Sequence, residues 1–224
     1  MFVLIFAISA RASVPPPAFI LSQAAKSHDG IKTLALEGRI TDVRTNEVFK
    51  EIMKIDFKTG RVVCSYLSAT DQALGGLETQ LKDIHRLGKF WLGVALDPNT
   101  VRFHQALQEL NAVPQEKTEA RLSRIGTQVT WAWGEESVIQ FLKDEFLAFD
   151  YQTGGTGPNG QEILLKDYAS SAVRVPRNAY VKLQGKDVYH FELKALKTNQ
   201  ILKYPSSLTP VSDSSAKEWT MLVR

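Results

Sequence analysis

The residues able to do chemistry are few and lie far apart. The four histidines are His28, His85, His104 and His190. None has a second histidine one helical turn away, which is the spacing of a helical metal-binding pair. The single cysteine, Cys64, lies in an alternating apolar run, where a small buried hydrophobe is a simpler interpretation than a nucleophile. We therefore expect no metal and no cofactor, and a metal site assembled by folding stays open as the alternative.

The sequence contains one glycine pattern that matches a catalytic fingerprint. Gly155-x-Gly157-x-x-Gly160 has dinucleotide-binding spacing, but that motif works only where the glycines lead from a strand into a helix. Here a Pro-Asn-Gly turn leads into the strand-like run 162–165, so a hairpin loop is favoured. No nucleophile elbow and no phosphate-binding loop occur, and paired carboxylates placed by the fold stay open. We expect no catalytic residues and no enzyme.

The charges are nearly balanced. With 27 basic and 24 acidic side chains and a net charge of +3, the chain gives little reason to expect nucleic-acid binding. The basic pairs Arg174/Arg177 and Lys194/Lys197 are typical of solvated strand ends. Contact with anionic lipid headgroups or with a partner protein is the alternative for these pairs.

The first residues indicate export. The apolar run Phe2–Ile8 is far shorter than the roughly 20 residues of a membrane-spanning helix, and it ends in Ala10-Arg11-Ala12. This pattern predicts a signal peptide over residues 1–12, although no basic residue precedes the run; a buried N-terminal strand is the alternative. Because no cysteine directly follows this run, we expect a periplasmic protein that is exported, soluble and not lipid-anchored.

Any functional site must be positioned by helices and strands. The first ones predicted along the chain are a helix and an antiparallel meander of three strands. Pro17 and Asp29-Gly30 bracket a predicted helix over 18–27. Strands are predicted over 33–41, 49–57 and 61–67, because apolar and polar residues alternate there. The resulting antiparallel sheet has one apolar face, carrying Leu34, Leu36, Ile40, Met53, Ile55 and Phe57.

The periodicity then changes to that of helices and returns to strands. Leu74, Leu77, Leu81 and Ile84 fit one helix face, and Asp97-Pro98 looks like the start of a second helix carrying Val101, Phe103, Leu107 and Leu110. Strands are predicted over 122–133, 138–142, 146–152, 161–168, 180–183 and 188–196. About nine strands would thus surround a helical insert near 70–112, in one domain over 13–224.

Trp131 and Trp133 are two positions apart in one predicted strand, so they share a face of the sheet. Packing in the core is one interpretation of this pair. Lining of an apolar ligand cavity is the other.

The order of these elements resembles a known family. The residues Ala24–Lys26, followed by Gly30-Ile31-Lys32-Thr33-Leu34, are similar to the opening of periplasmic LolA-like proteins. Further matches follow in order over 107–111, 121–126, 129–134 and 140–147, and at Val175-Pro176-Arg177 ahead of 181–196. The resemblance covers roughly residues 18–204.

The resemblance implies an α+β, mainly β fold: a curved antiparallel sheet forming an incomplete barrel, with helices covering its concave face. It also implies that acyl chains of lipids or lipoproteins bind between sheet and helices and are carried across the periplasm, possible partners including an envelope membrane protein. On this hypothesis the cavity lining would comprise Leu34, Leu36, Ile40, Met53, Ile55, Phe57, Trp131, Trp133 and Phe191. Glycines at 75, 76, 88 and 93 would allow the insert to move as a lid. The alternative is an envelope accessory protein that binds a protein partner through the same sheet.

Overall fold

The fold is known from a computed structural model. The structure describes residues 14–67, 94–95, 100–154, 160–169, 174–203, 209–210 and 220–223. The predicted helix around Leu74–Ile84, the Asp97-Pro98 start, the four glycines of the insert and residues 1–13 lie outside the described residues. None of the described helices is long and apolar enough to cross a membrane.

The described chain is mainly β. Its helices and strands are α1 (Pro17–Lys26), β1 (Thr33–Asp42), β2 (Glu47–Asp56), β3 (Arg61–Leu67), α3 (Thr100–Glu109), β4 (Arg121–Ile125), β5 (Gln128–Trp133), β6 (Ser137–Leu142), β7 (Ala148–Thr153), β8 (Gln161–Tyr168), β9 (Pro176–Leu183), β10 (Lys186–Thr198), β11 (Thr209–Pro210) and β12 (Thr220–Val223).

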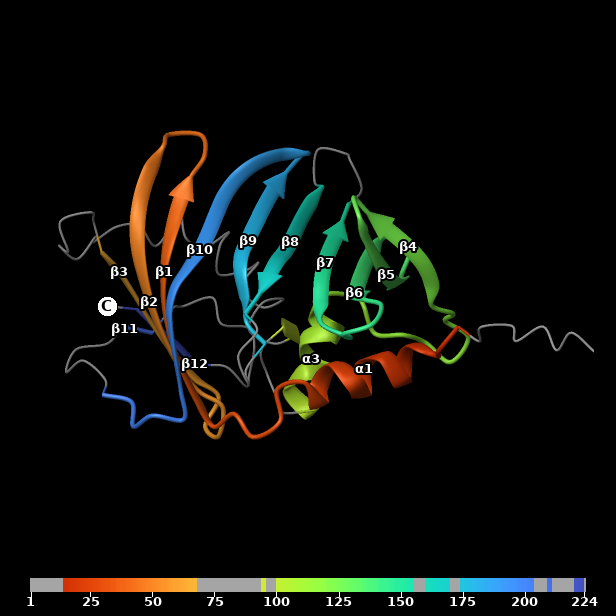
Figure 1. Ribbon diagram of the computed structural model, residues 1–224, viewed down its shortest axis with the longest axis horizontal. Helices are drawn as coiled ribbons and strands as arrows, with labels where there is room; N and C mark the ends of the chain where they lie inside the picture. The colour runs from red at the N-terminus through yellow and green to blue at the C-terminus, as the bar shows by residue number, and fades with distance from the viewer. Residues whose placement is uncertain are drawn as a thin grey trace, which may run out of the picture.

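All of these strands belong to one 12-stranded sheet in the order β11-β12-β3-β2-β1-β10-β9-β8-β7-β6-β5-β4. Its two ends, β11 and β4, are not paired with each other in the described part of the chain, so the sheet is not closed. Figure 1 shows the curvature of the sheet, with α1 and α3 lying towards the lower side of the view.

The predicted meander is confirmed. β1 and β2 pair antiparallel without interruption from Thr33↔Asp56 to Asp42↔Glu47, so their apolar sets fall on one face. In β1 the odd-numbered positions are partly or fully exposed and the even-numbered ones buried, as period-two patterning requires. Short turns join β1 to β2 and β2 to β3. Further along the chain, Gln184 and Gly185 (φ +54° and +74°) form the two-residue turn between β9 and β10.

Four sequence expectations need correction. The single strand predicted over 122–133 is a hairpin, β4 and β5, because Gly126 (φ +59°) turns the chain back so that Ile125 faces Gln128. β9 begins at Pro176 instead of at 180. The sheet has more strands than the expected nine or so, and β12 pairs parallel to β3. Val101 is 59% exposed, so it is not on the buried face of its helix.

The core joins both helices to the sheet. Ile20, Leu21 and Ala24 of α1 and Phe103 and Leu107 of α3 belong to one buried hydrophobic cluster with residues of nine strands, β1 to β3 and β5 to β10. Pro17 begins α1 at the first helical position, where a missing N–H costs no hydrogen bond. The buried side chains of α1 recur at helical spacing, which is why this segment packs on the sheet along one face.

The absence of a side chain at Gly38 leaves room for the ring of Phe191. A Cβ added to Gly38 would lie 2.0 Å from Cε2 of Phe191, whose ring is only 7% exposed. Gly38→Ala is expected to lower the free energy of unfolding by about 1–3 kcal/mol, because the buried ring must move. Urea unfolding measures this loss. Phe191→Leu in the same chain should recover part of it, and purely additive losses in the double variant would contradict the clash.

Candidate functional site

The residues predicted to line a cavity are all buried in the structure. Each of them is at most 7% exposed and belongs to the same hydrophobic cluster: Leu34, Leu36, Ile40, Met53, Ile55, Phe57, Trp131, Trp133 and Phe191. They come from β1, β2, β5 and β10, and Phe57 directly follows β2. In this conformation all nine are buried in the cluster that also contains residues of α1 and α3. An acyl chain would need part of that packing to open.

Hydrogen bonds attach α3 to the sheet at both ends. Arg102 donates through Nη2 to the carbonyl oxygen of Phe57. At the other end, the Tyr151 hydroxyl donates to the Leu110 carbonyl over 3.1 Å, and Trp133 Nε1 donates to the Ala112 carbonyl over 2.9 Å. Because these donors and acceptors are buried, releasing α3 would leave several of them unpaired, which is costly.

The attachment of α1 is mainly apolar. Its buried face rests on the cluster, and Phe19 meets Phe146 edge-to-face, with ring centroids 5.8 Å apart. Phe146 has a φ of +54°, an unusual backbone conformation for an aromatic residue, in the turn between β6 and β7. Just beyond the helix, His28 Nε2 lies 3.2 Å from the Arg174 carbonyl oxygen, and burial lowers the pKa of His28.

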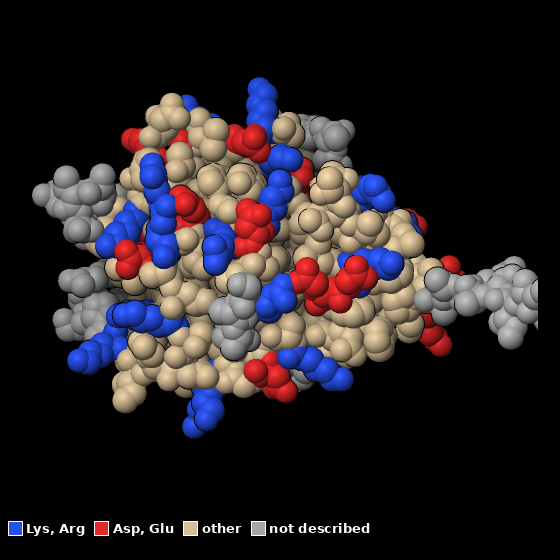
Figure 2. All heavy atoms as spheres, viewed as in Figure 1, with Lys and Arg blue, Asp and Glu red and all other residues tan. Residues whose placement is uncertain are grey.

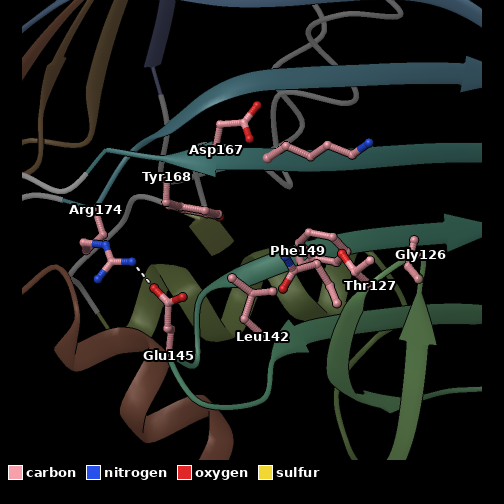
Figure 3. A pocket seen from close by; sticks show the side chains of 11 residues that line it. Gly126, Thr127, Leu142, Glu145, Phe149, Asp167, Tyr168 and Arg174 are labelled. Atoms are coloured by element: carbon pink, nitrogen blue, oxygen red, sulfur yellow. Dashed lines mark hydrogen bonds and ion pairs between the residues drawn. The ribbon is translucent and has the colours of Figure 1, made fainter.

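A second feature is a gap within the sheet. The ladder between β7 and β8 ends at Asp150↔Leu164, while β8 continues to Tyr168 with β9 as its partner. Where the two strands separate, a pocket of about 390 Å³ opens, and Figure 3 shows it. Its lining comprises Ile125, Gly126, Thr127, Gln128, Leu142, Glu145, Phe149, Lys166, Asp167, Tyr168 and Arg174.

The pocket combines an apolar wall with charged side chains, Arg174 and Glu145 at one end and Lys166 and Asp167 on β8. Phe149, 4% exposed, and Leu142 supply apolar surface, whereas Arg174 and Glu145 form an ion pair and point towards each other (Figure 3). The side chains of this pair are 37% and 46% exposed. An ion pair so open to water stabilises the fold little, so its two ends are free to exchange partners.

Tyr168 bridges the gap between β7 and β8. Its hydroxyl donates to the carbonyl oxygen of Ala148, a residue that is 3% exposed. Tyr168→Phe keeps the ring but leaves that carbonyl without its donor, so we expect a loss of about 1–2 kcal/mol in the free energy of unfolding. Urea unfolding checks this, with the half-buried Tyr180→Phe on β9 as control. Equal losses in the two variants would contradict the assigned role of the hydroxyl.

A buried polar row crosses β5, β6 and β7. Thr130 Oγ1 donates to Gln140 Oε1 over 2.7 Å, and Gln140 Nε2 donates to Asp150 Oδ2 over 3.0 Å. Gln152 Nε2 donates to the same oxygen over 2.9 Å. Asp150 is fully buried, and its Oδ1 has no hydrogen-bond partner among the described residues. Burial, with the nearby Glu162 charge, raises the pKa of Asp150 to about 7. Asp150 is not among the residues expected from the sequence, because Gln140, which bonds to it, comes from a neighbouring strand.

The other chemistry-bearing residues do not converge. His28 and His190 have separate partners, Arg174 and Asn178, and His104 is exposed. The described residues contain no group of three or more His, Cys, Asp or Glu that could hold a metal ion. Cys64 lies on β3 opposite Met53. Gly160 leads into the strand β8, as predicted, and residues 155–159 lie outside the description.

The face of the molecule seen in Figure 2 carries mixed charge. Basic and acidic side chains are intermixed across it. Ion pairs among the described residues include Lys182–Glu162 and Lys50–Glu37. Of the predicted basic pairs, Lys194 is bonded to Glu192, and Arg174 to Glu145. A surface of this kind favours no strongly charged partner.

No family model and no curated protein matches the chain. Solved structures do match. A LolA superfamily protein from Nitrosomonas europaea aligns with a TM-score of 0.49 and 8% identity over 84% of this chain and 96% of that one. A putative outer membrane lipoprotein-sorting protein domain from Vibrio parahaemolyticus aligns with a TM-score of 0.49 and 7% identity. The alignment covers 83% of this chain and 93% of that one. A DUF1329 family protein from Desulfovibrio piger aligns with a TM-score of 0.45 and 11% identity, over 84% and 95%. The structural neighbours of this chain thus include LolA superfamily and lipoprotein-sorting proteins, the group that its sequence motifs resemble.

Proposed function

We propose that the protein is exported to the periplasm, is cleaved after Ala12, and binds lipid or lipoprotein acyl chains between the sheet and its helices. The observation that carries the proposal is the single apolar cluster in which α1 and α3 meet the predicted lining residues. One domain over 13–224, with the helices covering the concave face of the sheet, is part of the same proposal. It describes a carrier and requires no catalytic group.

In this proposal α1 is the element that moves. It is held chiefly by apolar contact, whereas α3 is fixed by buried hydrogen bonds at both ends. An acyl chain that takes the place of Ile20 and Leu21 restores the apolar contacts that α1 gives up. Sheltering a few hundred Å² of hydrocarbon contributes several kcal/mol at roughly 25 cal/mol per Å². The free energy gained by sheltering the acyl chain is therefore close to the free energy lost when α1 leaves the cluster. Loading and release both require such a balance.

The test begins with the protein purified from cell envelopes, extracted with organic solvent and analysed by mass spectrometry. Co-purified lipid or acylated peptide is the expected result. Binding of a fluorescent fatty acid to the delipidated protein then measures the association rate. If neither assay detects an acyl ligand, the proposed function is wrong.

A matched pair of variants tests the role of α1. Ile20→Ala removes a fully buried contact, and Ser22→Ala changes an exposed position of the same helix. We expect Ile20→Ala to speed association of the fluorescent fatty acid at least about tenfold, because a core truncation costs about 2–5 kcal/mol of packing. Ser22→Ala should leave the rate unchanged. Equal rates in the two variants would exclude α1 as the moving element.

One observation favours the alternative of a protein partner. β4 stands at an end of the described strand order, and its Leu122 is 54% exposed beside exposed Arg121 and Arg124. An edge strand with an exposed apolar side chain and two cations suits pairing with an extended acidic segment of an envelope protein. A photocrosslinker at Leu122 tests this, with one at exposed Lys186, the first residue of β10, as control. A partner captured only at position 122 supports this alternative, and the absence of such a product contradicts it.

A further inference from the structure

We propose that the pocket between β7 and β8 binds a zwitterionic head group, with a phosphate on Arg174 and an ammonium on Glu145. Phosphoethanolamine is the simplest group of this class. The inference rests on the proposed function, because it identifies this head group as the polar end of the acyl ligand. Four observations support it.

The first observation is the state of the Arg174 guanidinium. Its Nη2 donates to Glu145, while its Nε is buried and has no hydrogen-bond partner among the described residues. Nε and Nη2 lie on the same edge of a guanidinium, the edge that binds two oxygens of a phosphate or carboxylate side by side. Glu145 uses only half of this edge. A phosphate would occupy both donors and satisfy the buried Nε.

The second observation is the balance of charge. If a phosphate alone displaced Glu145 from Arg174, the carboxylate would lose its cation next to a new anion. A ligand that also carries an ammonium gives Glu145 a new partner, so that the zwitterion is inserted between the two ends of the original pair. Because this pair is largely open to water, separating its ends costs little.

The third observation is the apolar wall beside the pair. Phe149 and Leu142 line the same pocket, and the ring of Tyr168 is held there by its hydrogen bond to Ala148. The gap of about 390 Å³ is large enough for a small polar head with its first methylene groups. A site for a bare inorganic ion would not need such a surface.

The fourth observation is the connection of both charged residues to α1. The Arg174 carbonyl is bonded to His28, which lies just beyond the end of this helix. Glu145 precedes Phe146, whose ring contacts Phe19 of α1. A head group bound between Arg174 and Glu145 therefore lies next to the helix that we propose to move, where an acyl chain would enter.

The experiment compares ligands by isothermal titration calorimetry of the delipidated protein. Dihexanoyl phosphatidylethanolamine carries both charges, dihexanoyl phosphatidylglycerol lacks the ammonium, and phosphorylethanolamine lacks the chains. Each lipid is used below its micelle concentration. We expect the phosphatidylethanolamine to bind about tenfold more tightly than the phosphatidylglycerol, as one charge-assisted contact would provide.

Two variants make the assignment specific. Arg174→Gln should weaken both lipids about tenfold, whereas Glu145→Gln should weaken the phosphatidylethanolamine and strengthen the phosphatidylglycerol. The second result is a change of preference, which loss of folding cannot imitate. Arg39→Gln, at an exposed position on β1, is the matched control and should change neither affinity.

The outcomes separate this inference from the proposed function. If both lipids and the fluorescent fatty acid bind, but without preference and without response to the variants, the head-group site is wrong and the acyl carrier stands. If no acyl ligand binds, the proposed function fails. If phosphorylethanolamine binds as tightly as the lipid, the pocket is a site for a soluble zwitterion and its assignment to a lipid head is overturned.

Discussion

The protein is expected to gain stability from Asp150 as the pH is lowered from 8 to 5. Burial raises the pKa of this carboxyl from 3.8 to about 7, so the folded state holds the proton more tightly than the unfolded chain does. Above pH 7 both states are ionised, and the folded state bears the full cost of a buried charge. Below pH 4 both are protonated and the cost disappears. A shift of this size corresponds to as much as about 4 kcal/mol.

Asp150→Asn isolates this contribution. The amide is neutral at every pH and still offers Gln140 and Gln152 an acceptor, so the variant should be more stable than wild type at pH 8. The advantage should shrink steadily towards pH 5. Urea unfolding across this range gives the difference directly, and Asp187→Asn at an exposed position near the start of β10 is the control. A difference between wild type and Asp150→Asn that does not change with pH would overturn the assignment.

Wild type and Asp150→Asn must be compared at each pH, because a second buried group, His28, changes the stability in the opposite direction as the pH falls. Burial lowers the pKa of His28, so the folded state disfavours its protonated form. Stability linked to His28 is therefore lost as the pH falls below its ordinary value of 6.5. This contribution is the same in wild type and Asp150→Asn, and it cancels in their difference.

Alternation in the sequence predicted the parts of the fold that local patterning determines. β1 and β2 alternate between buried and more exposed positions over much of their length, so their period of two predicts both the strands and the side that is buried. The burial of Leu34, Leu36, Ile40, Met53 and Ile55 follows from the same alternation. The hairpin of β4 and β5 was missed because Gly126 interrupts a run whose alternation looks continuous.

What depends on contacts between distant strands could not be predicted. Asp150 reads as an ordinary polar position on a strand, and only the register with β6 places Gln140 beside it. The pocket exists because β7 and β8 separate beyond Asp150↔Leu164, which no local pattern encodes. Arg174 was singled out in a basic pair, but its bond to Glu145 joins segments 29 residues apart.

The largest effect of a single substitution is expected at Trp133. Its side chain is 1% exposed and stacks on Phe141, with ring centroids 5.3 Å apart and an interplanar angle of 8°. Trp133→Ala removes this packing and leaves a cavity, for which we expect a loss of about 3–5 kcal/mol. Domains of this kind are stable by only about 5–15 kcal/mol, so the variant should unfold at a much lower urea concentration.

Conservative variants separate the two functions of this side chain. Trp133→Phe keeps an aromatic ring but leaves the buried Ala112 carbonyl without its donor, so about 1–3 kcal/mol should be lost. Trp131→Phe, the matched control on the same face, removes a bond to the carbonyl of half-buried Lys143 and should cost less. Hydrogen exchange of the amides at the C-terminal end of α3 supplies the decisive readout. Only Trp133→Phe should speed their exchange, because the Trp133 bond, unlike that of Trp131, is one of the two that attach this end to the sheet. Unchanged exchange would mean that Trp133 acts through packing alone.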